Sequence, residues 1–469
     1  MAALALAEVL GAAGGDLRGD LAADTLFERV ELDAGKVRPG DLFVAVPGER
    51  LDGHELVPLA ALRGAAAALV SRRWARNVRA LALPLVVVEE PIVALQQVAS
   101  ARRDRLAPTV VGITGSVGKS SAKEVVAAVL AQRFATYRSP GNRNNEIGLP
   151  LSLLEMDPGT EVAVLEMAGG YALGELELLA RIAKPTVAVV TNVLPVHLER
   201  MGTIAAIART KAEVVEALSA DGIAILNGDD PRVREMSSRC RGRVLTFGRD
   251  EGNQVRAEAV TSYGLDGCAF WADVSGSRLY LEVPLVGDHA VELVLAALAV
   301  GHVLGMTPAE MAPGLTDPAI QIRLRRVPGL NGSLLLDDTY NATTASVVSA
   351  LRLLEKSGAQ RRIAVLGDML ELGSLSDREH RVVGRRAAGA VDLLVTYGDL
   401  AAAIADEAAT APSRRSPDVV RFRPDERGEL VEYVRARLGP GDVVLVKGSR
   451  SLRMEELVEA LREPSAPTG

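Results

Sequence analysis

The sequence contains little cysteine, few aromatic residues and no long apolar segment. Its two cysteines, Cys240 and Cys268, are too few for a disulfide framework and lack the spacing of a metal site, which indicates a reducing compartment. Only 3% of the residues are aromatic although 48% are hydrophobic, so the cores must be built mainly from Ala, Val and Leu. The longest apolar segment, residues 293–304, is shorter than the about 20 residues of a membrane-spanning helix. These absences exclude a disulfide-rich secreted protein and an integral membrane protein.

The N-terminus and the net charge exclude further classes of protein. Residues 1–10 are apolar, but they lack a basic segment and include Glu8, which favours an amphipathic helix over a signal peptide. The formal net charge of −7 provides no broad cationic surface, so we expect neither a nucleic-acid nor an anionic-membrane partner. We therefore expect a cytoplasmic protein. A monomer is a separate expectation.

The order of the predicted elements indicates an α/β protein. A chain of 469 residues is too long for one core and suggests about three domains of roughly 150 residues each. Strands are predicted at 41–46, 110–114, 161–166, 186–192, 223–227, 333–337, 362–366, 392–397, 419–422 and 442–446. Because helical segments separate most of these strands, most of them should pair in parallel between two layers of helices. Residues 255–283 alternate in polarity and predict an antiparallel addition.

These patterns divide the chain into three expected domains. The first is a small N-terminal α/β domain over residues 1–105. A central domain with a mostly parallel sheet and a phosphate loop follows over 106–316, and a Rossmann-like C-terminal α/β domain completes the chain over 317–469.

Residues 110–121 have the pattern of a nucleotide phosphate loop, with a β-branched run, a glycine loop and a helix in succession. Backbone N–H groups freed by Gly115 and Gly118 can point at phosphate oxygens. Lys119 can reach the outer phosphates, and the Ser120 hydroxyl can bind Mg²⁺. The general pattern G-x-x-x-x-G-K-[ST] is not fully met, because isoleucine occupies the position of its first glycine. The loop predicts ATP or GTP binding.

Polar residues at the ends of two further strands should lie beside this loop, because ligands of an open parallel sheet bind at the carboxyl ends of its strands. The strand at 161–166 ends in Glu166, a carboxylate suited to Mg²⁺. The strand at 186–192 is followed by His197, which by itself also fits a structural histidine. Lys211, in a predicted helix, by itself also fits a solvated helix face.

Further motifs follow in a fixed order along most of the chain. They are Pro47-Gly-Glu-Arg-Leu-Asp-Gly-His54, Gly141-Asn-Arg-Asn-Asn-Glu-Ile-Gly-Leu-Pro150, Asn192-Val-Leu-Pro-Val-His-Leu-Glu199, Asp337-Asp-Thr-Tyr-Asn-Ala342, Gly367-Asp-Met-Leu-Glu-Leu-Gly373 with His380, and Lys447-Gly-Ser-Arg-Ser-Leu-Arg-Met-Glu455. Together with the phosphate loop, they resemble the ATP-dependent Mur ligases, in particular their MurF type. The resemblance implies an ADP-forming ligase that joins D-alanyl-D-alanine to UDP-N-acetylmuramoyl-tripeptide, through an acyl phosphate, in peptidoglycan synthesis.

The resemblance also implies roles around the phosphate loop. Catalysis would rest on Lys119, Glu166, His197, Lys211 and Arg323, with Lys119 on the β- and γ-phosphates of ATP. Two Mg²⁺ ions are implied, one held by Ser120 and Glu166 and one at His197. Lys211 matches a lysine that is carbamylated in some members. The implied nucleotide contacts are Thr114, Gly115, Ser116, Val117, Gly118, Lys119, Ser120, Ser121, Arg323, Asp338 and Asn341.

Other matching residues are implied to serve the two substrates. Asp33 falls in the segment that serves the uridine end in the family. A second segment matches the one that lies along the UDP-sugar substrate, and a third matches a loop facing the reacting end. These two segments contribute Asn142, Asn144 and Asn145, and Lys447, Ser449 and Arg450, respectively. Because the implied groups lie on separate domains, catalysis would require the domains to close.

Three segments depart from the family pattern, and they keep two alternatives open. This chain has Asp33-Ala34-Gly35 where the family has Asp-Ser-Arg, and Gly287-Asp-His289-Ala290 where the family has Gly-x-His-Asn. It has Glu166-Met-Ala-Gly-Gly170 where the family generally has Glu-Met/Leu-Gly-Met/Ala. The first departure allows a Mur-like ligase for a different acid, as in folylpolyglutamate-type ligases. The other alternative is a nucleotide-binding paralogue without catalysis, although Lys119, Glu166, His197, Lys211 and Asp338 are all present.

Overall fold

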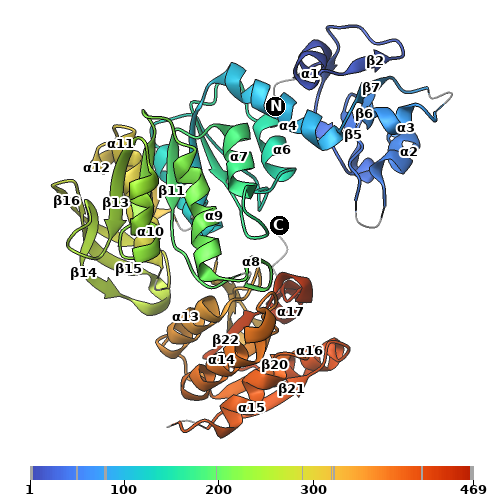
Figure 1. The fold of residues 1–469 in the computed structure, drawn as a ribbon. Coiled ribbons are helices and arrows are strands. Elements are labelled where there is room, and N and C mark those ends of the chain that lie inside the picture. Colours follow the sequence, from blue (N-terminus) through green and yellow to red (C-terminus); the bar gives the residue numbers. More distant parts are fainter. Residues whose placement is uncertain are drawn as a thin grey trace.

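The computed structural model describes residues 4–48, 51–78, 82–196, 198–287, 289–317, 320, 323–413 and 416–464. In these residues the strands form three large sheets, one after another along the chain, each accompanied by helices (Figure 1). This confirms the predicted α/β fold, in which a central phosphate-loop unit lies between two smaller α/β units. Among the described residues, every helix falls short of the length and apolarity that crossing a bilayer requires.

The first unit contains a five-stranded sheet with the order β2-β7-β6-β5-β4. Strands β4 to β7 pair in parallel, and β2 pairs antiparallel with β7. The predicted N-terminal helix is present but begins later, at Leu6, after a short strand that pairs with β3. The strands are β1 Leu4–Ala5, β2 Asp16–Arg18, β3 Leu26–Phe27, β4 Val30–Glu31, β5 Leu42–Val44, β6 Ala67–Ser71 and β7 Leu85–Val88, and the helices are α1 Leu6–Ala13, α2 Val57–Leu62, α3 Arg72–Ala75 and α4 Pro91–Leu106.

Helix α4 joins the first unit to the central one. Its buried residue Leu95 belongs to a single apolar cluster that also contains Leu6 of α1 and Leu149 of the central unit. The two units therefore share part of their core. The predicted domain boundaries, at 105/106 and 316/317, stay a prediction.

The central sheet has nine strands among the described residues, in the order β16-β15-β14-β13-β12-β11-β8-β10-β9. Strand β8 is buried on both faces, because Val110 packs into one apolar cluster while Val111 and Ile113 pack into another. Strands β10 and β11 flank β8 in parallel, so the ends of all three meet at one edge. The strands are β8 Thr109–Thr114, β9 Thr136–Arg138, β10 Val162–Glu166, β11 Val187–Val190, β12 Ile223–Asn227, β13 Arg243–Gly248, β14 Val255–Ser262, β15 Cys268–Val274 and β16 Ser277–Val283.

Helices surround this central sheet. They are α5 Lys119–Leu130, α6 Gly148–Leu154, α7 Glu175–Ala183, α8 Leu198–Met201, α9 Ile204–Glu216, α10 Pro231–Glu235, α11 Ala290–Val303 and α12 Pro308–Thr316. The predicted antiparallel addition is present as β14, β15 and β16, but it continues the central sheet. Strand β13, which the sequence pattern did not predict, makes this connection by pairing in parallel with both β12 and β14.

The third unit has a six-stranded sheet with the order β17-β18-β22-β19-β20-β21. Strands are present at all five predicted positions, and the additional β17 pairs antiparallel at the edge. The strands are β17 Arg325–Pro328, β18 Leu334–Asp337, β19 Arg361–Gly367, β20 Leu393–Tyr397, β21 Asp418–Phe422 and β22 Asp442–Lys447, and the helices are α13 Thr344–Glu355, α14 Ser376–Ala390, α15 Ala402–Thr410, α16 Arg427–Arg435 and α17 Glu455–Leu461.

Candidate active site

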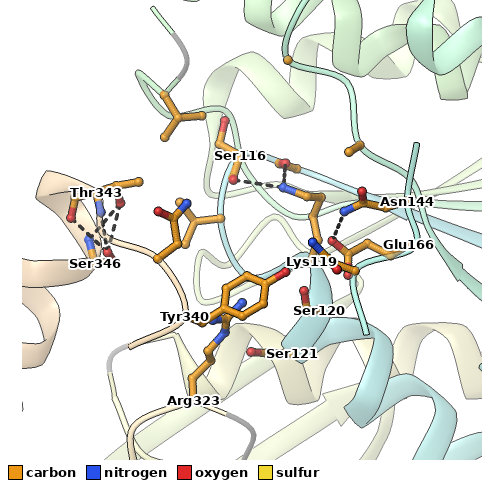
Figure 2. A pocket seen from close by; sticks show the side chains of 18 of the residues that line it. Ser116, Lys119, Ser120, Ser121, Asn144, Glu166, Arg323, Tyr340, Thr343 and Ser346 are labelled. Atoms are coloured by element: carbon orange, nitrogen blue, oxygen red, sulfur yellow. Dashed lines mark hydrogen bonds between the residues drawn. The ribbon is translucent and has the colours of Figure 1, made fainter. Parts of the chain in front are cut away.

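A cavity of about 1170 Å³ lies between the central and third units. One wall is formed by the phosphate loop, the end of β10 and the loop after it, and the facing wall by the segment that follows β18 and by the loop after β22. Figure 2 shows Lys119 and Glu166 of the first wall facing Tyr340 and Arg323. A volume of this size accommodates a nucleotide together with part of a second substrate.

The phosphate loop depends on two glycines. A Cβ at Gly115 would lie 2.0 Å from Thr191 Oγ1, so a side chain there would clash with the end of β11. Gly118 has φ of 83° and is the N-cap of α5, a backbone conformation that L-residues with a side chain rarely adopt. These two positions let the backbone turn sharply from strand to helix, so that its N–H groups surround a concave site.

Side chains at the end of β11 hold the loop in place. The Asn192 amide accepts a hydrogen bond from Val117 N (2.9 Å) and donates one to Val117 O (3.0 Å). Thr191 Oγ1 also donates to Val117 O, at 3.1 Å. Ser116 Oγ donates to Leu194 O (3.0 Å) and accepts from Leu194 N (2.9 Å). Neutral hydrogen bonds from a neighbouring strand end thus determine the loop's shape.

Lys119 lies at the first turn of α5 with its ammonium group folded over the loop. Its Nζ donates to Gly115 O at 2.9 Å and to Ser116 O at 3.2 Å. Burial lowers the pKa of Lys119, the Glu166 carboxylate opposes this shift, and the Arg323 guanidinium adds to it. The two carbonyl bonds hold Lys119 Nζ at the position where the outer phosphates of a nucleotide bind in such loops.

Glu166 is only 2% exposed and ends β10 beside the loop. Its Oε1 accepts a hydrogen bond from Asn144 Nδ2 at 2.7 Å. Within the described part of the chain, its buried Oε2 has no hydrogen-bond partner. Burying a carboxylate oxygen without a partner costs folding free energy unless a cation or a hydrogen-bond donor binds it.

Lys211, on α9, is also only 2% exposed, so it is not the solvated helix residue that its sequence context allowed. Its Nζ donates to Gly169 O in the loop after β10. Burial lowers the pKa of Lys211 to about 7, and Lys119 contributes to the shift. A large fraction of this amine is therefore neutral near pH 7.

The facing wall brings an arginine and a tyrosine to the loop. The Arg323 guanidinium stacks over the Tyr340 ring, with 3.5 Å between Cζ and the ring centroid. Burial raises the pKa of Tyr340, and the Arg323 and Ser120 side chains oppose this shift. In Figure 2 the Tyr340 hydroxyl points toward Lys119 and Ser120. The stacked Tyr340 and Arg323 side chains thus line the same cavity as the phosphate loop.

A buried ion pair organises the same wall. Lys447 Nζ lies 2.5 Å from Asp338 Oδ2 and also donates to Asn341 O at 2.8 Å. Burial lowers the pKa of Lys447, and Asp338 opposes the shift. These bonds tie the end of β22 to the segment after β18. Asp338, Asn341 and Lys447 line the cavity, and their nucleotide and substrate contacts stay a prediction.

The remaining predicted residues fall into four groups. Asn142, Asn145, Ser121, Ser449 and Arg450 line the cavity, while Thr114, at the end of β8, is buried beneath the loop. Asn145 Oδ1 accepts from Gly148 N (2.8 Å), and Ser449 Oγ accepts from Leu370 N (2.9 Å). Asp33 lies in the first unit, away from this cavity, and accepts from Gly35 N at 2.9 Å. His197 lies outside the described residues.

Profile comparisons identify three consecutive domains. Residues 27–103 match the Mur ligase family catalytic domain, residues 113–301 the Mur ligase middle domain, and residues 322–450 the Mur ligase glutamate ligase domain. The chain belongs to the Mur ligase family. This membership agrees with the resemblance that the motifs indicated.

Within the Mur ligases, the chain is similar over nearly its whole length to proteins of the MurF group. The UDP-N-acetylmuramoyl-tripeptide--D-alanyl-D-alanine ligase of Bacillus subtilis is 35% identical over 448 residues, covering 94% of each chain. A crystal structure of MurF from Acinetobacter baumannii superposes with a TM-score of 0.86 at 27% identity, covering 98% of each chain. MurF ligase from Thermotoga maritima, solved in complex with ADP, superposes with a TM-score of 0.76 at 30% identity and covers 92% of this chain and 96% of its own.

Two residues of this Mur ligase have contacts that its sequence motifs do not indicate. Tyr340 lies in the motif at 337–342, and its ring stacks on the Arg323 guanidinium. Asn192 ends a predicted strand, and its amide holds both backbone groups of Val117. The polar residue at the end of the strand next to the loop was the available signal for Asn192.

Proposed function

We propose that this Mur ligase joins D-alanyl-D-alanine to UDP-N-acetylmuramoyl-tripeptide, at the expense of ATP, in peptidoglycan synthesis. The observation that carries the proposal is the convergence on one cavity of a phosphate loop, a buried carboxylate and the Arg323 and Asp338 side chains. The match to a ligase of this name, at 35% identity over 94% of each chain, supports the same substrates.

The proposed reaction has two steps. The terminal carboxylate of the tripeptide attacks the γ-phosphorus of ATP, which forms an acyl phosphate and releases ADP. The neutral amine of D-alanyl-D-alanine then attacks the acyl carbon, phosphate leaves with the electron pair of the broken C–O bond, and the nitrogen releases one proton as the amide forms. Lys119 and Arg323 stabilise the negative charge that develops on the transferring phosphoryl group.

Glu166 and Ser120 fit a Mg²⁺ ion. Oxygen donors are what this ion prefers, and the unpartnered Oε2 of Glu166 among the described residues is a donor that such an ion would complete. When bound, Mg²⁺ supplies positive charge that screens repulsion between a carboxylate and the γ-phosphate. We assign a second ion to His197, following the family pattern.

Lys211 is proposed to carry a carbamate. Its lowered pKa provides neutral amine, which is the form that reacts with CO₂ to give a carbamate and one released proton. The modification would replace a buried cation with an anion near Lys119.

The remaining assignments extend the same proposal. The chain would act as a cytoplasmic monomer with domains at 1–105, 106–316 and 317–469. The three domains bind the UDP substrate, bind ATP and complete the ligase site, respectively. Asp33, Asn142, Asn144, Asn145, Lys447, Ser449 and Arg450 are the proposed substrate contacts. The cavity is lined from residue 115 onward, so the sugar nucleotide would have to span two units.

Phosphate release from ATP and Mg²⁺ tests the function. We expect release only when UDP-N-acetylmuramoyl-tripeptide and D-alanyl-D-alanine are both present. Release with a different acid and amine, but not with this pair, would establish the alternative of a Mur-like ligase for another acid, which the Ala34-Gly35 departure motivates. Absence of release with every pair, despite ATP binding, would establish the catalytically inactive paralogue.

A further inference from the structure

Lys123 is a buried lysine on α5, one turn after Lys119, and the proposed reaction does not use it. Its side chain is 1% exposed, and its Nζ donates to Ser139 O at 2.6 Å and to Gly141 O at 2.9 Å. Glu124 Oε1, at 3.3 Å, is its charged neighbour. Burying an ammonium group is costly, so two carbonyl bonds and one ion pair hold it in a defined position.

The segment that Lys123 holds, residues 139–145, runs along the end of β10. Ser139 N donates to Val164 O at 3.1 Å, and Ser139 Oγ accepts from Glu166 N at 3.2 Å. Further along, Asn144 O accepts from Ala168 N at 2.8 Å, and Asn144 Nδ2 donates to Glu166 Oε1 at 2.7 Å. The segment therefore holds both the backbone and the carboxylate of Glu166.

These contacts form a continuous chain from the phosphate helix to the carboxylate. Lys119 and Ser120 begin α5, Lys123 lies in its next turn, and the 139–145 segment links Lys123 to Glu166. Figure 2 shows the Asn144 amide bonded to Glu166 beside Lys119. Because Asn144 occupies Oε1, the oxygen left without a partner among the described residues is Oε2.

We propose that Asn144 and Lys123 are positioning residues for Glu166. Asn144 orients the carboxylate so that Oε2 meets a divalent cation, and Lys123 maintains the distance between this carboxylate and the Ser120 hydroxyl by tying the 139–145 segment to α5. The inference rests on the proposed metal role of Glu166. It also gives Asn144 a task besides the substrate contact predicted from its motif.

Binding of Mn²⁺, as a spectroscopic substitute for Mg²⁺, tests the inference without turnover. The free Mn²⁺ signal in electron paramagnetic resonance is titrated with the full-length protein in the presence of saturating ADP. We expect Asn144→Ala and Lys123→Met to weaken Mn²⁺ binding by about 10- to 100-fold, the usual effect of losing a group that orients a metal ligand. Affinity for ADP alone, measured in EDTA, should stay within about twofold.

Two further variants make the test specific. Lys184→Met removes a lysine whose partner is the exposed Asp104, and it should leave Mn²⁺ binding unchanged. The double variant Lys123→Met/Asn144→Ala should lose little more than Asn144→Ala alone, because Lys123 acts through the segment that carries Asn144. If the fold-loss of Mn²⁺ affinity in the double variant equals the product of the two single losses, the two residues act independently and this linkage is wrong.

Glu166→Gln separates failure of the inference from failure of the proposed metal role. If Glu166→Gln leaves Mn²⁺ affinity unchanged, the metal role of Glu166 is wrong, and the inference fails with it. If Glu166→Gln weakens Mn²⁺ binding but Asn144→Ala and Lys123→Met do not, the inference alone is wrong. It is equally overturned if both variants weaken metal-free ADP binding as much as Mn²⁺ binding, because the residues would then only stabilise the fold.

Discussion

The two walls of the cavity are held by different kinds of interaction. The neighbouring strand end holds the phosphate loop by neutral hydrogen bonds from Thr191 and Asn192, and the loop's own Lys119 donates to two of its carbonyls. The facing wall depends on charged groups, namely the Lys447–Asp338 ion pair and the Arg323 guanidinium stacked on Tyr340.

This difference indicates how each wall responds to change. Neutral hydrogen bonds to a backbone keep their geometry when nearby charges change, which suits a loop that receives a polyanion. A buried ion pair depends on both partners, because removal of one leaves the other charged and unpaired. We therefore expect changes in the loop to affect chemistry, and changes in the facing wall to affect stability as well.

Replacing Lys119 should have the largest effect. Lys119→Ala removes the cation at the outer phosphates and should lower substrate-dependent phosphate release by about 10³-fold or more, with the unfolding transition retained. Lys356→Ala, an exposed lysine in the third unit, is the control and should leave release unchanged. Normal turnover in Lys119→Ala would contradict the assignment of the loop.

Replacing Lys447 should mainly reduce stability. Lys447→Met leaves Asp338 buried and unpaired, so the free energy of unfolding, measured by chemical denaturation, should fall by about 3–5 kcal/mol. The double variant Lys447→Met/Asp338→Asn should recover part of this loss, because the unpaired charge is gone. If the double variant is less stable than Lys447→Met, the unpaired charge of Asp338 is not the cause of the stability loss.

The charge of Lys211 should depend on pH near neutrality. Since its pKa is lowered to about 7, its neutral fraction should rise roughly tenfold from pH 6 to pH 8. Carbamate formation, detected by ¹³C NMR with ¹³C-bicarbonate, should rise in parallel and be absent in Lys211→Met.

The same shift predicts the direction of a stability change. The folded-state pKa of Lys211 lies below its ordinary value of 10.5, so the folded protein binds fewer protons than the unfolded chain between about pH 7 and 10.5. The contribution of Lys211 to stability should therefore rise with pH across this window. A Lys211→Met variant with an unchanged pH slope would contradict this.

The smallest expected effect concerns the cap of α13. Thr343 Oγ1 accepts a hydrogen bond from Ser346 N, and Thr343→Ala should lower the free energy of unfolding by about 1 kcal/mol. Thr307, the N-cap of α12, is a matched control outside the cavity lining. Both variants should lose similar stability in denaturation experiments, but only Thr343→Ala should alter the KM for ATP. If Thr343→Ala has the same KM for ATP as the unmodified protein, the cap of α13 does not belong to the nucleotide site.

Local patterns were sufficient to predict the loop wall. Strand β8, the two glycines and Lys119 are consecutive in the sequence, and parallel neighbours end at the same edge of a sheet, so Glu166 was expected nearby. The contacts of the facing wall could not be predicted in this way. Lys447 and Asp338 are separated by 109 residues, and the sequence alone does not show that β18 and β22 are neighbours.

The sequence by itself determined the α/β fold and the phosphate loop, and it predicted which charged residues surround that loop. It did so because glycine placement, strand and helix periodicity and short motifs act over a few residues. Only the tertiary structure decided that Asn192 holds the loop, that Asn144 binds one oxygen of Glu166, and that Arg323 stacks on Tyr340. Such contacts depend on how strands and units pack, and burial, which lowers the pKa of Lys211 to about 7, exists only after that packing.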